Sequence, residues 1–217
     1  MTQEPRHTPR RPGTDVDDRR PTLDALTRIA DCLMALVCII VFSPLLAVCA
    51  LIVACEDGRP VIYRQERIGK GGKPFMILKF RTMRDCAEDD GPQLCAACDA
   101  DDPRLLKGGR WMRKHHLDEL PQLFNVLKGD MAFVGPRPER EFYIKQIMQH
   151  NPRYSELYAI RPGVTSYATI YNGYTDTMEK MLRRLELDLF YLKHRSMLLN
   201  LRILWLTFYN IASGRVF

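Results

Sequence analysis

Two adjacent carboxylates, Asp118 and Glu119, have the most chemically suggestive surroundings in the chain. A basic run at residues 113–116 precedes them, and Pro121, which is tolerated in the first turn of a helix, follows. Other acidic pairs occur as well: Asp17-Asp18, Glu56-Asp57, Asp89-Asp90 and Asp101-Asp102. Adjacency alone therefore does not identify a site, and the basic neighbours are what distinguish this pair.

Asp118 is a candidate N-cap for a helix that we expect over 119–128, ended by Gly129. The first turn of a helix presents free N–H groups, which attract phosphate and lower the pKa of a nearby carboxyl. An ionised Asp118 could attack a phosphoryl group, and Glu119 could hold Mg²⁺ against diphosphate oxygens. A capping Asp beside a solvated Glu is the structural alternative, and spacing alone favours it.

Residues 33–54 form an uncharged apolar block whose length as a helix, about 33 Å, approaches the thickness of a bilayer core. Ser43-Pro44 interrupts this block. The proline removes a backbone hydrogen bond and favours a bend, and the serine hydroxyl can satisfy the freed carbonyl. Positive charge lies on both flanks, at Arg28 and Arg59, so both ends could face the cytoplasm. A spanning helix, a re-entrant hairpin and a buried core helix all stay open at this point.

The rest of the chain has a mixed pattern of α and β elements in which helices dominate. Residues 61–65 and 75–81 are predicted to form a hairpin of two short strands joined by a glycine-rich turn. Further helices are expected over 105–116, 140–150, 177–193 and 198–211. The last of these carries apolar and aromatic residues at helical spacing, which suits either core packing or a membrane interface.

Composition narrows the partners without choosing among them. Lys and Arg number 32 against 26 Asp and Glu, and the formal net charge of +6 favours nucleotides, phospholipid headgroups or nucleic acid. Four of the seven cysteines lie in or beside the apolar block, which fits small hydrophobes in a reducing compartment. Cys86, Cys95 and Cys98 could bind zinc, but no second well-spaced pair supports this, and we interpret residues 85–103 as a surface insertion.

Longer motifs around the carboxylates resemble a known family. Residues 117–131, LDELPQLFNVLKGDM, followed by 133–139, FVGPRPE, are similar to the signature of the bacterial sugar transferases, the monotopic phosphoglycosyl transferases. The stretches KFRTM at 79–83 and RPGVT at 161–165, and the apolar block with its Ser-Pro pair, match in order. The resemblance runs from about residue 24 to the C-terminus.

The resemblance implies an activity, a topology and a location. A sugar-1-phosphate would pass from a UDP-sugar to polyprenyl (undecaprenyl) phosphate with release of UMP, initiating a surface polysaccharide or glycoconjugate. The fold would be α+β and helix-dominant, with a re-entrant membrane helix broken at Ser43-Pro44 and amphipathic interfacial helices. Residues 21–57 would form the re-entrant helix, and 58–217 a catalytic domain on the cytoplasmic face of the bacterial inner membrane. The polar, aperiodic composition of residues 1–20 separately predicts a disordered polar tail.

The resemblance also assigns roles to individual residues. Asp118 matches the nucleophile, and Glu119 the carboxylate associated with Mg²⁺. Lys79, Arg113 and Arg137 match cations that surround the phosphates, where fixed positive charge would stabilise phosphoryl transfer. After residue 163 the chain departs from the family pattern, because Tyr174 stands where an Arg is usual. We therefore assign no donor contact to that position.

Other functions explain fewer of these sequence features. A non-catalytic, membrane-tethered basic module would explain the charge but would leave the Asp-Glu motif without a role. His115 and His116 could act as acid–base groups, although a basic helix end facing a substrate cleft is the simpler interpretation. We expect a phospholipid membrane as a partner and no nucleic acid. The sequence leaves the sugar, the glycan and a homodimer undecided.

Overall fold

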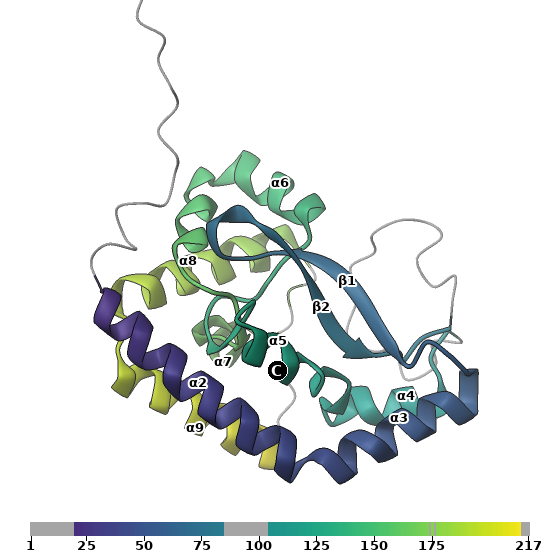
Figure 1. Ribbon diagram of the computed structural model, residues 1–217. Helices are drawn as coiled ribbons and strands as arrows, with labels where there is room; N and C mark the ends of the chain where they lie inside the picture. The colour runs from purple at the N-terminus through teal and green to yellow at the C-terminus, as the bar shows by residue number, and fades with distance from the viewer. Residues whose placement is uncertain (1–19, 85–103, 174, 176, 214–217) are drawn as a thin grey trace, which may run out of the picture.

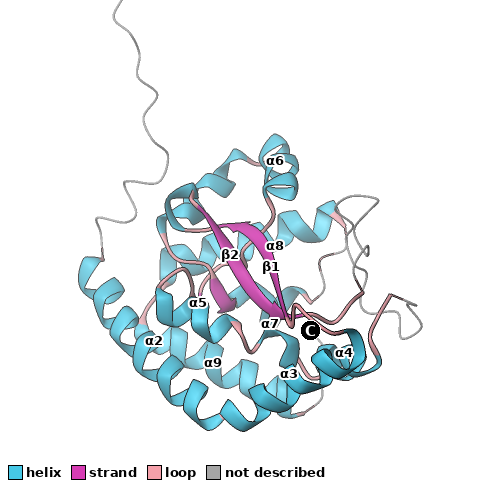
Figure 2. Ribbon diagram, turned by 45° about the vertical axis from the view of Figure 1, so that its right-hand side comes forward, coloured by secondary structure: helices cyan, strands magenta, loops and turns pink. Residues whose placement is uncertain are grey.

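The computed structural model describes residues 20–84, 104–173, 175 and 177–213. Helices dominate, and two pairs of short strands lie among them (Figures 1 and 2). The expected α+β class with helices dominant and a small hairpin is confirmed. The predicted tail lies outside the described residues except for Arg20, and the insertion with Cys86, Cys95 and Cys98 lies wholly outside them.

The N-terminal elements are a pair of apolar helices, α2 (Pro21–Val41) and α3 (Ser43–Asp57), whose axis bends by 64° at their junction. Ser43 Oγ donates to the Ile40 carbonyl at 2.8 Å, and this is the carbonyl that Pro44, having no N–H, cannot engage. The predicted break and its serine compensation are therefore confirmed. In the described part of the chain, no single helix is long and apolar enough to cross a bilayer, and α2 and α3 reach that length only together.

The predicted hairpin is present. Strands β1 (Ile62–Ile68) and β2 (Pro74–Phe80) pair antiparallel, from Ile62 opposite Phe80 to Ile68 opposite Pro74. A short 3₁₀ turn, η1 (Lys70–Gly72), joins them. This register places Lys79 opposite Tyr63, near the end of β2.

The motif region folds as three short elements. They are α4 (Lys107–Lys114), the 3₁₀ turn η2 (Leu117–Glu119) and α5 (Gln122–Lys128). Helix α5 begins after Pro121, so the prediction that Asp118 is its N-cap is wrong. Asp118 lies inside η2 because His116, at φ 55°, turns the chain through the left-handed region first. Gly129, at φ 101°, ends α5 as predicted.

The C-terminal helices agree with prediction within a few residues: α6 (Glu141–His150), α8 (Met178–His194) and α9 (Met197–Ala212). The sequence did not predict the 3₁₀ segment η3 (Pro152–Ala159), helix α7 (Tyr167–Asn172), or strands β3 (Ala132–Val134) and β4 (Gly163–Thr165). Strands β3 and β4 pair in parallel. Three residues are too few to show a strand periodicity.

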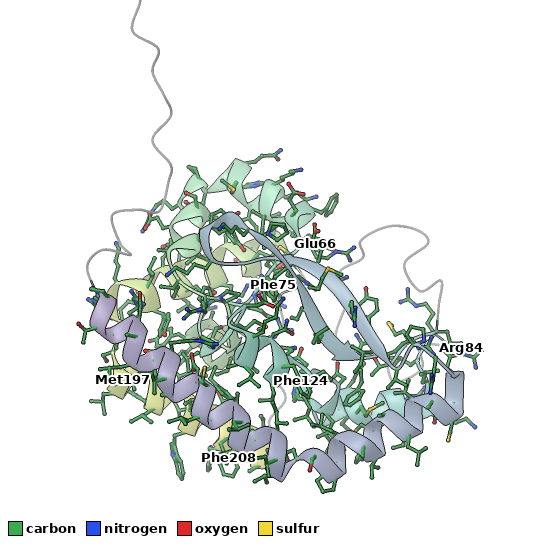
Figure 3. The ribbon with its side chains drawn as sticks, viewed as in Figure 1. Glu66, Phe75, Arg84, Phe124, Met197 and Phe208 are labelled. Carbon is green, nitrogen blue, oxygen red and sulfur yellow. The ribbon has the colours of Figure 1, made fainter. Side chains whose placement is uncertain are left out.

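The core has two main parts. One joins α6, η3 and α8 through Ile147, Leu157 and Leu189, and the other joins α3 to α4 through Val53 and Met112. Leu117 and Leu120 of the motif region pack against the second part, and Val126 lies in a smaller third cluster with Ala35 and Ile77. Helix α9 runs beside α2 along one edge of the molecule, and Figure 3 marks Met197 and Phe208 along this edge.

Candidate active site

Glu119 is held between two cations that come from distant parts of the chain. Its Oε1 atom lies 2.6 Å from Lys79 Nζ on β2 and 3.1 Å from Arg137 Nη2, in the segment after β3. Burial by itself would raise the pKa of this carboxyl, but Lys79 and Arg137 hold the pKa well below its usual value. In turn, Glu119 raises the pKa of Arg137. Glu119 is therefore a fixed negative charge in a cationic setting.

Asp118 has the opposite electrostatic balance. Asp118 is only 8% exposed. Burial is the main cause that raises the pKa of its carboxyl, and the negative charge of Glu119 is the second. Lys79, Arg113 and His116 partly counter this effect. The prediction that a helix end lowers the Asp118 pKa is therefore wrong. Removal from water and a neighbouring negative charge outweigh the surrounding cations.

All five residues predicted for the site meet here. Lys79 comes from the end of β2, Arg113 from the last turn of α4, Asp118 and Glu119 from η2, and Arg137 from the segment that follows β3. Among the first three elements, η2 contacts both β2 and α4, whereas the segment with Arg137 follows β3, which pairs closely with β4. Gly135 permits this approach, because a Cβ there would lie 2.4 Å from the Arg161 carbonyl oxygen.

Asn125 is a supporting residue whose role the sequence did not reveal. It is buried in α5, accepts a hydrogen bond from Leu78 N at 3.0 Å and donates to the Met76 carbonyl at 2.8 Å. These contacts fasten α5 to β2 on the residue immediately before Lys79. Asn125 therefore holds α5 against the strand that carries Lys79. A polar residue amid the apolar positions of 123–127 was the available signal.

The bent helix pair is fastened to the same elements. Arg28 on α2 donates to the carbonyls of Val126 and Leu127, at 2.5 and 2.8 Å, at the C-terminal end of α5. At the end of α3, both Glu56 carboxyl oxygens accept from Gly108 N, at 2.9 and 3.0 Å, where α4 begins. The acidic pair Glu56-Asp57 therefore serves a structural role, since Asp57 also pairs with Arg81 at 3.2 Å.

This arrangement suits a phosphorylated ligand. Lys79, Arg113 and Arg137 place positive charge around two carboxylates. These cations would balance the negative charge of a phosphate bound beside the carboxylates. The pKa values of the two carboxyls are pushed in opposite directions, as is typical of acid or nucleophile pairs at active sites.

Most of this chain matches one known protein family. The sequence model of the family described as "Bacterial sugar transferase" matches residues 22–214. The chain belongs to the bacterial sugar transferase family. The resemblance drawn from the motifs is thereby confirmed.

Curated relatives of this bacterial sugar transferase carry specific names. It is 36% identical over 89% of its length to "UDP-N-acetylgalactosamine-undecaprenyl-phosphate N-acetylgalactosaminephosphotransferase" of Aeromonas hydrophila. It is 38% identical over 85% to the "UDP-glucose:undecaprenyl-phosphate glucose-1-phosphate transferase" of Escherichia coli, and 40% identical over 89% to the protein of that name from Caulobacter vibrioides. The chain spans 45%, 40% and 71% of these relatives' lengths, respectively.

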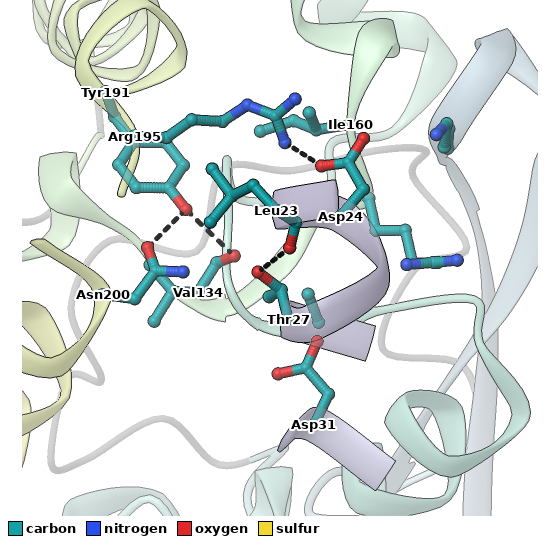
Figure 4. A pocket seen from close by; sticks show the side chains of 12 residues that line it. Leu23, Asp24, Thr27, Asp31, Val134, Ile160, Tyr191, Arg195 and Asn200 are labelled. Carbon is teal, nitrogen blue, oxygen red and sulfur yellow. Dashed lines mark hydrogen bonds and ion pairs between the residues drawn. The ribbon is translucent and has the colours of Figure 1, made fainter. Parts of the chain in front are cut away.

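A cavity of about 30 Å³ lies elsewhere in the transferase, between the start of α2 and the junction of α8 and α9 (Figure 4). There Arg195 pairs with Asp24, and Tyr191 Oη donates to Asn200 Oδ1 at 2.8 Å. The Arg195–Asp24 pair fastens the first turn of α2 to the link between α8 and α9, and the Tyr191–Asn200 bond joins α8 to α9. The cavity is therefore part of the joint between α2 and the rest of the protein.

Two sequence predictions cannot be placed in this site. Tyr174, to which no donor contact was assigned, and the cysteines at 86, 95 and 98 lie outside the described residues. Within the described ranges, no group of three or more His, Cys, Asp or Glu side chains is placed to hold a metal ion. His115 Nδ1 lies 2.9 Å from the Trp111 carbonyl oxygen within α4 and its C-cap, whereas His116 approaches both carboxylates closely enough to lower their pKa values.

Proposed function

We propose that this bacterial sugar transferase moves a sugar-1-phosphate from a UDP-sugar to polyprenyl phosphate, through a covalent intermediate on Asp118. The observation that carries the proposal is the pair of contacts from Lys79 and Arg137 to Glu119, beside a buried Asp118. The names of the relatives supply the substrate classes, a UDP-sugar and undecaprenyl phosphate.

In the first step, an oxygen of the Asp118 carboxylate attacks the phosphorus that bears the sugar. The bond from that phosphorus to the bridging oxygen breaks, and UMP leaves with the electron pair. The product on the protein is an acyl phosphate ester of the sugar. Arg113 and Lys79, which already lower the pKa of Asp118, would also stabilise negative charge on the transferring phosphoryl group.

In the second step, a phosphate oxygen of polyprenyl phosphate attacks the same phosphorus and the Asp118 carboxylate leaves. The lipid then carries a diphospho-sugar, and the carboxylate is restored. An acyl phosphate has a good leaving group, so each half-reaction is easier than a direct exchange between two phosphates. The product would be the lipid-linked starting unit of a surface polysaccharide or glycoconjugate.

Mg²⁺ fits the donor set of this site. Mg²⁺ usually binds one or two carboxylates together with substrate phosphates instead of an all-protein cage, and the site offers Asp118 and Glu119 beside Lys79, Arg113 and Arg137. Glu119 would hold the ion, which would supply positive charge to the diphosphate oxygens. Lys79 and Arg137 keep Glu119 ionised and oriented for that role.

We further propose that α2 and α3 form a re-entrant hairpin in the cytoplasmic leaflet of the inner membrane. Apolar side chains are exposed along α2, including Ile29, Leu33 and Ile40, at 59%, 62% and 64%. Leu198 and Phe208 on α9 are 78% and 66% exposed, and this helix would lie in the interface beside α2 (Figure 3). Arg28 and Glu56 tie the two arms of the hairpin to α5 and α4, which flank the site.

Intact-mass spectrometry tests the covalent step. The purified protein, depleted of lipid, is incubated with Mg²⁺ and UDP-glucose or UDP-N-acetylgalactosamine, the donors in the relatives' names. We expect one added hexose-phosphate or N-acetylhexosamine-phosphate mass, which polyprenyl phosphate then removes. Asp118→Asn should abolish the adduct.

Glu141→Gln is the matched control, because Glu141 is an exposed carboxylate shortly after the same motif and pairs with Lys145 at 3.1 Å. The adduct should persist in this variant. An adduct that survives in Asp118→Asn, or that is absent from the unaltered protein with every UDP-sugar while UMP is still released, refutes a nucleophilic Asp118. Failure to release UMP at all would instead favour the non-catalytic basic module.

A further inference from the structure

The segment that carries Arg137 has few hydrogen-bond donors of its own. Pro136 and Pro138 flank Arg137 and have no N–H, and each favours an extended conformation in the residue before it. The backbone N–H groups of this segment must therefore find partners outside it. Gly135 N donates to the Thr165 carbonyl at 3.1 Å, on β4.

The backbone of Arg137 interacts with the carboxyl of Asp188, a residue of α8 that is 2% exposed, and lowers its pKa. The backbone of Ala168, at the start of α7, lowers the pKa of the same carboxyl. One turn earlier on α8, Arg184 pairs with the Glu139 carboxylate and donates to Thr175 Oγ1 at 2.7 Å. Consecutive turns of one helix therefore hold Arg137 by its backbone and Glu139 by its side chain.

Strand β1 holds the same segment from the other side. Arg67 donates to the Pro138 carbonyl at 3.3 Å and lies 3.5 Å from Glu139 Oε2. Ile68 N donates to the Glu139 carbonyl at 3.1 Å. The segment is clamped between β1 and α8, and the Arg137 side chain extends from it to Glu119.

We propose that Asp188 and Arg184 are positioning residues, which set the backbone of residues 135–139 so that the Arg137 guanidinium reaches Glu119. Neither touches the carboxylates of the site. They act through Arg137 and Glu139, from a helix that lies outside the motifs used to recognise the site. The proposal rests on the proposed function only for what Arg137 does once it is in place.

A buried Asp and Arg could instead serve stability alone, and the two roles predict different results. A purely structural role lowers the stability of every neighbouring segment together. A positioning role acts on residues 135–139 and, through them, on the step that needs Arg137. The experiment therefore compares Asp188→Asn and Arg184→Gln with Leu189→Ala, which damages the packing of the same helix without touching the segment.

Hydrogen exchange followed by mass spectrometry gives a readout that does not depend on activity. In Asp188→Asn, peptides covering 135–140 should exchange about tenfold faster or more, whereas Leu189→Ala, studied at matched stability, should leave them within about twofold of the unaltered protein. Arg184→Gln should have the same effect as Asp188→Asn and keeps the test decisive if Asp188→Asn does not fold. Unchanged exchange in both variants, or equal acceleration in Leu189→Ala, overturns the proposal.

A double-mutant cycle tests the connection to Arg137. Asp188→Asn should slow UMP release by about tenfold in the unaltered background, but by less than about twofold when Arg137 is already Ala, because the two changes remove one effect. Additive losses overturn the proposal. If Asp118→Asn remains active while the exchange result holds, the proposed function fails and the positioning role survives.

Discussion

Asp188 makes the stability of this protein depend on pH in a way that one substitution can isolate. Burial, as the largest cause, raises the pKa of this carboxyl from 3.8 to about 7, against the opposing effects of Arg184 and two backbone hydrogen bonds. Its Oδ1 atom lacks a hydrogen-bond partner among the described residues, which leaves the charged form poorly compensated. The folded protein therefore binds this proton more tightly than the unfolded chain does.

The sign follows from linkage. A carboxyl with a raised folded-state pKa contributes its full stability below the ordinary value, and that contribution is lost as pH rises toward the folded value. The loss is about 1.4 kcal/mol for each pH unit between the two values. From about pH 5 to about pH 7 it reaches roughly 2 kcal/mol, because the slope flattens near the upper value.

Thermal unfolding in detergent at these two pH values measures the effect. For a chain of this size, roughly 2 kcal/mol corresponds to a shift of about 4–8 °C in Tm. We expect the Tm of the unaltered protein to fall by that amount relative to Asp188→Asn, whose amide does not titrate. Comparing the two proteins cancels every other titrating group. Tm curves that stay parallel from about pH 5 to about pH 7 would refute the raised Asp188 pKa.

Substitutions at three other positions test the elements that position the site. Pro44→Leu restores the N–H that can bond to the Ile40 carbonyl, so the bend should open into a spanning helix. A Cys introduced at position 10 should then react with an impermeant thiol reagent added from the periplasmic side. In the protein that keeps Pro44, the same Cys should stay protected. Asn125→Ala leaves Leu78 N and the Met76 carbonyl without their partner and should lower the unfolding free energy in urea by about 2–4 kcal/mol, a result that a change below ~1 kcal/mol would contradict. His116→Gly accepts the left-handed conformation and His116→Val does not, so the glycine variant should be about 1 kcal/mol more stable than the valine variant by Tm.

Local patterns were sufficient to predict most of the framework. The hairpin around Gly69 to Gly72, the break at Ser43-Pro44 and the long C-terminal helices depend on turn residues, proline and apolar periodicity, which act within a few residues. Strands β3 and β4 escaped prediction because three-residue strands depend on pairing between distant segments. The convergence of Lys79 and Arg137 on Glu119 came from the family motifs and had no local signal.

Burial explains why the electrostatics of the site could not be predicted. The N-cap interpretation of Asp118 assumed an exposed helix end, but the left-handed turn at His116 places Asp118 inside the protein. Helix α8 did contain an overlooked signal. Arg184 and Asp188 lie on the same buried face as Leu185 and Leu192, where charged residues need partners. A charge within an apolar helical stripe was therefore a sign of a specific contact.

The opposite pKa shifts of the two site carboxyls lead to a pH profile for covalent adduct formation. Attack requires ionised Asp118, whose pKa is raised by burial and by Glu119, so the rate of the UMP burst should increase with pH through this raised pKa. Lys79 lowers the pKa values of both carboxyls, and Lys79→Met should therefore move the rising limb to higher pH as well as reduce the maximal burst rate, by about 10²-fold or more. Arg140→Met provides a control outside the Lys79–Glu119–Arg137 contacts and should leave the position of the limb unchanged. Single-turnover UMP release across the pH range measures both quantities. A Lys79→Met profile that is slower but keeps its midpoint would show that Lys79 acts on the substrate alone, and the electrostatic link between Lys79 and Asp118 would be rejected.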